Sequence, residues 1–96
     1  MKLFIVGIEN STPEQEKTFA DWSSRSSLGY WHWIPHFWLV HTDDDYTVSA
    51  IRDKVMELFP TMSIIVIELG TSSRWAGYGP VTAPHDMFAW IKKNLG

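Results

Sequence analysis

The 96-residue sequence contains no cysteine, which excludes disulfides and thiol chemistry and fits a reducing compartment. It also has no stretch that approaches the roughly 20 apolar residues of a membrane span. The apolar start of the chain reaches Glu9 and Asn10 after too few residues for a signal peptide with a cleavage site. We therefore expect a cytoplasmic protein with no membrane partner.

Positive charge is scarce and scattered. Eight Lys and Arg stand against eleven Asp and Glu, a formal net charge of −3, and the one adjacent basic pair is Lys92-Lys93. Nucleic-acid binders usually carry a basic stripe, so the balance argues against tight, nonspecific nucleic-acid binding by the monomer and leaves only a localised site open. A nucleophile-elbow motif is also absent, so Ser/His/Asp hydrolase chemistry has no support.

Aromatic side chains are abundant by contrast, with 15% aromatic and 45% hydrophobic residues. The run from Trp31 to His41 holds three of the six Trp and three of the four His. Each large aromatic side chain buries about 150–250 Å². A chain of this size has too little interior to hide them all, so we expect self-association.

Strand and helix patterns alternate along the chain. Continuous apolar, β-branched runs predict strands, and Thr12 and Thr47 are suited to N-cap two amphipathic helices. The strands are expected over residues 2–8, 30–34, 37–42 and 63–69, and the helices over 13–26, 48–59 and 84–94. The order β-α-β-β-α-β with an added C-terminal helix predicts a single α+β domain over residues 1–96, a ferredoxin-like sandwich.

The fourth strand is the main reason to expect a dimer. In this plan the first and third strands are central and the fourth lies at an edge. Residues 64–67 are all apolar, so this strand has no face suited to water, and such an edge is normally covered. We expect the C-terminal segment or a second subunit to cover it, either along the edge or over the open sheet face.

Several motifs follow one another in a distinctive order and spacing. They are a Gly-aromatic turn, a Trp-His hairpin, an acidic turn, Trp38-Leu39-Val40, Ile51-Arg52-Asp53-Lys54-Val55, Val66-Ile67-Glu68-Leu69, Trp75-Ala76-Gly77-Tyr78 and Trp90-Ile91-Lys92-Lys93. Together they resemble small SinR-like proteins, relatives of the CRISPR-associated nuclease subunit with a ferredoxin-like fold (the "Cas-two" superfamily), and the resemblance covers nearly the whole chain. It implies a homodimer with the sheets facing each other, and a metal-dependent nuclease or nucleic-acid-binding role.

The metal-binding Asp of that superfamily sits at the end of the first strand. When Asn10 is matched to the family pattern, Ile8 stands where the Asp belongs, and Ile cannot bind a metal. Glu9 is adjacent, but a shift of one residue points a strand side chain to the opposite face. The resemblance therefore favours a non-catalytic, homodimeric interaction or regulatory protein with a nucleic-acid or protein partner.

The alternative is a weak nuclease that uses Mg²⁺ or Mn²⁺, with Glu9 as catalytic and metal-binding residue and Asp43 and Asp44 as further metal ligands. The simpler interpretation of the acidic turn is that it precedes the second helix and helps to cap it. A zinc site formed by His32, His36 and His41 is disfavoured, because His36 and His41 are an odd number of residues apart and face opposite sides.

Binding or interface roles are predicted for aromatic, His and Arg side chains of two segments: Trp31, His32 and Trp33, and Arg74, Trp75 and Tyr78. Core and dimer packing is favoured over base stacking for the first group, since no Lys or Arg lies between residues 26 and 52. The second group is typical of interface anchors and of anion sites. A third hypothesis is a small-molecule pocket lined by Trp and His at the dimer seam.

Overall fold

The computed structural model describes residues 1–70, 74–79, 81 and 86–95. It contains β1 (Lys2–Ile8), α1 (Pro13–Arg25), β2 (Gly29–Ile34), β3 (Phe37–Thr42), α2 (Val48–Leu58), β4 (Ile64–Leu69) and α3 (Ala89–Leu95). The first six elements match the predicted bounds to within one residue. Within the described residues, no helix has both the length and the apolar character needed to cross a membrane.

The third helix begins later than the sequence predicts. Its expected start at residues 84 and 85 lies outside the described residues, and residues 86–88 precede the helix, which begins at Ala89. The backbone N–H of Phe88 donates to the Asp86 carboxylate at 3.0 Å. An Asp side chain favours such a local turn over a continuing helix, because it competes for backbone donors.

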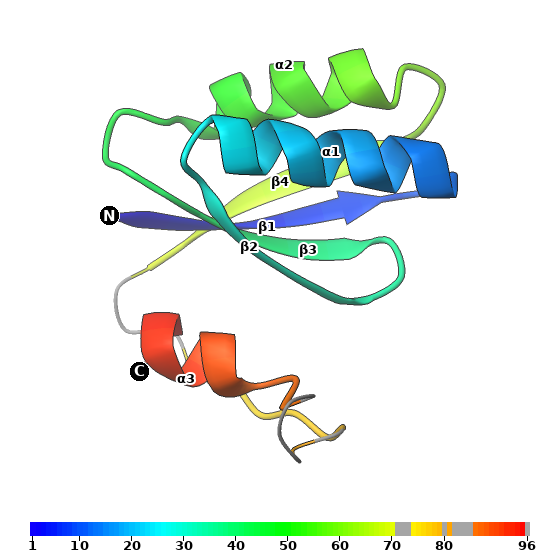
Figure 1. The fold of residues 1–96 in the computed structure, drawn as a ribbon. Helices are drawn as coiled ribbons and strands as arrows, with labels where there is room; N and C mark the ends of the chain where they lie inside the picture. The colour runs from blue at the N-terminus through cyan, green and yellow to red at the C-terminus, as the bar shows by residue number, and fades with distance from the viewer. Residues whose placement is uncertain (71–73, 80, 82–85, 96) are drawn as a thin grey trace.

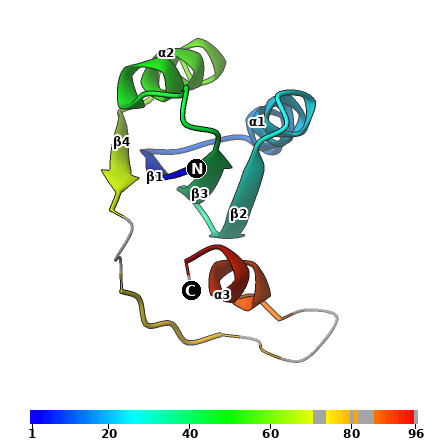
Figure 2. The ribbon, with the colours of Figure 1, turned by 90° about the vertical axis from the view of Figure 1, so that its left-hand side faces the viewer.

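The strands form one antiparallel sheet in the order β2-β3-β1-β4, with β1 and β3 central and β4 at an edge, as predicted. Helices α1 and α2 cover one face of this sheet, and α3 lies against the other (Figures 1 and 2). We call these the helix face and the C-terminal face. The fold is therefore α+β and compatible with the ferredoxin-like plan.

The helices on the helix face begin at well-formed N-caps. The Thr12 hydroxyl accepts from the Gln15 N–H at 3.2 Å, while the Gln15 side chain accepts from the Thr12 N–H at 2.9 Å. This is the reciprocal capping box that satisfies two donors at a helix start. The Thr47 hydroxyl caps α2 in the same way, by accepting from the Ala50 N–H at 3.1 Å.

Alternation along the strands divides the apolar side chains between two cores. The larger core lies between the sheet and the helices α1 and α2; its buried members are Phe4, Val6, Ile8, Phe19, Leu28, Trp38, Val40, Ile51, Val55 and Phe59. The smaller core lies on the C-terminal face, with the buried residues Trp31, Leu39, Met87, Phe88 and Ile91. The Trp31 Nε1–H donates to the Met87 carbonyl at 2.5 Å and so joins β2 to the start of α3.

Candidate functional site

The predicted acidic ligands lie at opposite ends of the central strand β1. Glu9 follows the end of β1, whereas Lys2 at its start pairs with Thr42, which immediately precedes Asp43 and Asp44. A strand of this length, at ~3.3 Å per residue, separates the two groups by about 20 Å. The structure therefore does not bring them together within one chain, and in the described part of the chain no three His, Asp or Glu form a metal-binding group.

Each of these carboxylates has a local partner instead. The Ser63 N–H donates to the Glu9 Oε1 at 2.9 Å, and this hydrogen bonding lowers the pKa of Glu9 below its usual range. The N-terminal ammonium lies 2.5 Å from the Asp44 carboxylate, and its hydrogen bond and charge lower the pKa of Asp44. Glu9 thus fastens the end of β1 to the turn before β4.

The three His of the aromatic run point in different directions. His32 stacks on Trp38 at the helix face, with ring centroids 3.6 Å apart, whereas the His41 ring meets Trp90 edge-on on the other side of the sheet. His36 is exposed in the hairpin turn with a φ of 65°. No zinc site can form from rings that are separated by the sheet itself.

His32 is a structural link between β2 and α1. Its Nε2 lies 2.7 Å from the Glu16 carboxylate and its Nδ1 lies 2.9 Å from the Phe37 carbonyl. The Glu16 carboxylate and the Phe37 carbonyl are both acceptors, so the imidazole connects α1 and β3 through its two ring nitrogens. Both ring nitrogens of His32 have partners within the chain, so neither is left for an external ligand.

The predicted interface aromatics fall into two groups. Trp31 is buried in the smaller core, whereas Trp33 keeps 44% of its surface exposed. Trp75 is 37% exposed and Tyr78 fully exposed, and Arg74 beside them is exposed as well. Of the six residues predicted for binding, the structure therefore presents Trp33, Arg74, Trp75 and Tyr78 to the outside.

The free edge of β4 offers backbone hydrogen-bonding groups. The Glu9 N–H donates to the Ser63 carbonyl at 2.8 Å, and alternate residues of an antiparallel ladder bond to the same neighbour. By this alternation the backbone N–H and C=O groups of Ile65 and Ile67 bond to β1, where these residues lie opposite Gly7 and Ile5. The N–H and C=O groups that point away from the sheet belong to Ile64, Val66 and Glu68.

Two isoleucines on this edge strand are exposed on the C-terminal face. Ile65 keeps 59% of its surface exposed and Ile67 keeps 45%, whereas Ile64 and Val66 pack toward the core on the helix face. The sequence predicted an apolar strand that needs cover, but only the sheet register shows which of its side chains lack it. The described C-terminal segment leaves these two uncovered.

A groove between α2 and β4 runs beside the same edge. Val48, Ser49 and Arg52 line it from the helix, and residues 64–66 line it from the strand. Val48, at the start of α2, is 39% exposed, whereas Ile51 and Val55 further along the same helix are buried. The role of Arg52 was missed, because nothing in the local sequence places it beside β4.

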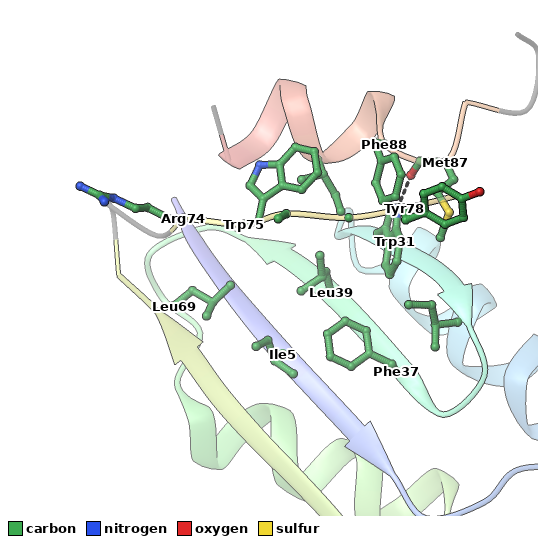
Figure 3. A pocket seen from close by; sticks show the side chains of 14 residues that line it. Ile5, Trp31, Phe37, Leu39, Leu69, Arg74, Trp75, Tyr78, Met87 and Phe88 are labelled. Carbon is green, nitrogen blue, oxygen red and sulfur yellow. Dashed lines mark hydrogen bonds between the residues drawn. The ribbon is translucent and has the colours of Figure 1, made fainter. Parts of the chain in front are cut away.

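A cavity of about 290 Å³ lies on the C-terminal face (Figure 3). Its lining is apolar and aromatic apart from Arg74, and it comes from the sheet, from residues 74–78 and from the region of α3: Ile5, Trp31, Ile34, Phe37, Leu39, Leu69, Arg74, Trp75, Ala76, Gly77, Tyr78, Met87, Phe88 and Ile91. Arg74, Trp75 and Tyr78, which the sequence predicted as binding residues, therefore line one cavity together with the buried Trp31.

The candidate site as a whole is thus a mainly apolar surface. It consists of the β4 edge with its exposed isoleucines, the groove beside α2 and the cavity under β1 and β3. In comparisons with protein-family models, with curated proteins and with solved structures, nothing matches this chain.

Proposed function

We propose that this chain is a non-catalytic interaction protein that works as a homodimer, in which β4 of one copy pairs antiparallel with β4 of a second copy. The observation that carries the proposal is the outer edge of β4, with which no described strand pairs. The strand has no Pro, no Lys and a single charged residue, Glu68, and it exposes Ile65 and Ile67. Natural sheets block edges of this kind unless the edge is used for pairing.

The backbone groups favour one register for this pairing. With Val66 opposite Val66 of the second copy, Ile64 lies opposite Glu68 of the second copy, and every outward N–H and C=O of these three residues has a partner. A shift by two residues in either direction moves Ile64 or Glu68 opposite a residue outside the strand. The central register therefore pairs the most hydrogen-bonding groups.

The same register brings the exposed apolar side chains together. Ile65 of each copy lies opposite Ile67 of the other on the C-terminal face. Directly opposed β-branched side chains are favourable cross-strand pairs. Four half-exposed isoleucines would form one continuous apolar row across the dimer axis.

Charge complementarity supports this arrangement on the helix face. Glu68 of the second copy would lie beside Ile64, which lines the same groove as Arg52. Among the described residues, the Nε and Nη2 of Arg52 donate to its exposed neighbour Asp53 at 3.1 and 3.0 Å, and this exposed pair leaves its remaining N–H groups available at the groove. Two Arg52–Glu68 ion pairs, related by the twofold axis, would flank the paired strands.

Pairing through the edge is favoured over the arrangement with facing sheets that the resemblance implies. In each chain α3 and residues 74–79 project from the C-terminal face (Figure 2). Lys92 and Lys93 of α3 are exposed and charged. Facing sheets would press these side chains toward the apolar surface of the partner, which costs desolvation without a matching acid.

We favour a non-catalytic role because the Glu9 carboxylate accepts from the Ser63 N–H, and in the described chain it belongs to no group of three His, Asp or Glu that could hold a metal ion. The resemblance to SinR-like proteins supports an interaction role with a nucleic-acid or protein partner. Incubation of the purified protein with RNA and duplex DNA, with and without Mn²⁺, checks this part. Cleavage that disappears in Glu9→Gln would support the nuclease alternative and overturn it.

A charge-reversal series tests the dimer and its register. We expect the protein to sediment as a dimer, Glu68→Arg and Arg52→Glu each to weaken the dimer, and the double variant to restore it. Arg25→Glu, on an exposed Arg in the last turn of α1, is the control and leaves the dimer unchanged. A monomer at tens of micromolar overturns the homodimer, whereas single and double variants that behave alike overturn the register.

A further inference from the structure

We infer that the cavity on the C-terminal face is a binding site for a flat aromatic acid of one or two fused rings. This inference goes beyond the homodimer and does not depend on it. The cavity lies between the sheet and residues 74–78, and Figure 3 draws 14 of the residues that line it.

The cavity stays open because residues 74–79 are held against the start of α3 instead of the sheet. A Cβ on Gly77 would lie 2.5 Å from the Phe88 ring, and one on Gly79 would overlap the Met87 sulfur. Trp75 also stacks on Phe88, with ring centroids 5.5 Å apart. Close contact on the α3 side therefore fixes this segment and leaves space on its sheet side.

The floor of the cavity is apolar and comes from the central strands. Ile5 of β1 pairs with Leu39 of β3, and both project to the C-terminal face together with Phe37 (Figure 3). The one buried polar side-chain group at its wall, the Trp31 Nε1–H, already donates to the Met87 carbonyl. Water would find few hydrogen-bond partners there, and a cavity of this kind favours an apolar occupant.

The walls favour a planar occupant. The ring of Trp31 meets Phe37 edge-on, with centroids 6.2 Å apart, and the Trp75–Phe88 stack closes another side. Aromatic rings pair best with other rings in stacked or edge-to-face arrangements. The volume of about 290 Å³ lies near the lower end for ligand pockets, so it suits one or two fused rings.

Arg74, the one charged side chain among the described lining residues, determines which charge the ligand should carry. Arg74 lies at the end of the cavity near Leu69, with its guanidinium directed outward, away from the rings (Figure 3). It is exposed and forms no ion pair with any residue that the structure describes. Because Arg74 is exposed, its long side chain can rotate to bring the guanidinium to a carboxylate that a bound ring carries at this end of the cavity.

Three naphthalene probes of equal size test the inference on the full chain: 2-naphthoate, 2-naphthalenemethanol and 2-naphthylmethylammonium. We expect 2-naphthoate to bind most tightly in isothermal titration calorimetry, and the Trp31 indole N–H signal to shift in nuclear magnetic resonance spectra. Arg74→Gln is expected to weaken naphthoate by about fivefold and leave the alcohol unchanged. Arg25→Gln, in the last turn of α1, is the matched control.

Cavity-filling variants locate the bound ring. Ile5→Phe and Leu69→Phe each place a ring in the space, and we expect either to abolish binding while sedimentation of the protein stays unchanged. Two substitutions are used because one can perturb the fold. The site is overturned if naphthoate at millimolar concentration produces no heat and no shift, or binds both filled variants as well as the native protein. Equal affinities for all three probes overturn the preference for an acid.

Discussion

Replacing both Ile65 and Ile67 with Thr should weaken the proposed dimer without unfolding the chain. Both side chains lie on the C-terminal face of the edge strand, with 59% and 45% of their surfaces exposed. Thr is also β-branched and keeps the strand preference of the position. Ile64 and Val66, which contribute to the core, are left in place, so we expect the monomer to retain its fold.

The size of the effect follows from the exposed fractions. Complete burial of an Ile side chain contributes about 1.5–3 kcal/mol, so covering the remaining half of each contributes about 1 kcal/mol. Four such side chains in the dimer give about 4 kcal/mol, of which Thr, with one methyl group retained, removes about 3 kcal/mol. At 1.4 kcal/mol per tenfold, the dissociation constant of the dimer should rise by about 100-fold.

Sedimentation velocity over a concentration series measures this constant, and circular dichroism checks that the variant remains folded. Met56→Gln removes an apolar side chain on α2 that is 52% exposed, and it should leave the constant unchanged. If the double Thr variant is folded and dimerises within threefold of the native protein, the β4 edge is not the interface. If Met56→Gln weakens the dimer equally, general surface apolarity explains the association.

Two further predictions concern the framework of the site. Gly77→Ala should lower the free energy of unfolding in chemical denaturation by about 1–3 kcal/mol, because the added Cβ would lie 2.5 Å from the Phe88 ring. Gly70→Ala, which has open space around it, is the control and should have little effect. Equal effects of the two substitutions would mean that the Gly77 contact is unimportant. The lowered pKa of Glu9 implies that its bond to Ser63 stabilises the fold above the unfolded-state pKa and that this contribution is lost as pH falls through the folded-state pKa. The difference in melting temperature between the native protein and Glu9→Gln should therefore shrink between about pH 6 and pH 3, and a constant difference would contradict the assignment.

Thermodynamic coupling between the proposed ligand cavity and the proposed dimer edge of β4 can be measured directly. Ile5 of the cavity floor pairs with Ile67 of the exposed β4 edge, so the two surfaces share neighbouring strands. If both proposals hold, the dissociation constant of the dimer measured with saturating naphthoate tells whether the two sites are coupled. Linkage requires that any change in dimer affinity equal the change in naphthoate affinity between monomer and dimer.

Local patterns in the sequence were sufficient for most of the secondary structure. The apolar run of β1, the capping box at Thr12 and the N-cap at Thr47 act over a few residues. Neighbouring side chains are therefore enough to predict the strand and the helix starts that they produce. The start of α3 was misplaced because Asp86 favours a local turn there and Trp31, far away in the chain, takes the Met87 carbonyl. A contact between residues so far apart in the chain cannot be predicted from the local sequence.

The candidate site was decided mainly by the register of the sheet. Antiparallel pairing placed Glu9 and Asp44 at opposite ends of β1, and it turned Ile65 and Ile67 to a face that the described C-terminal segment does not cover. By itself the sequence determined that β4 is a strongly apolar strand, since composition and alternation are local properties. Only the tertiary structure decided which side chains stay exposed, that Arg52 lines a groove beside β4, and that a cavity opens under the central strands, because each depends on contacts between distant segments.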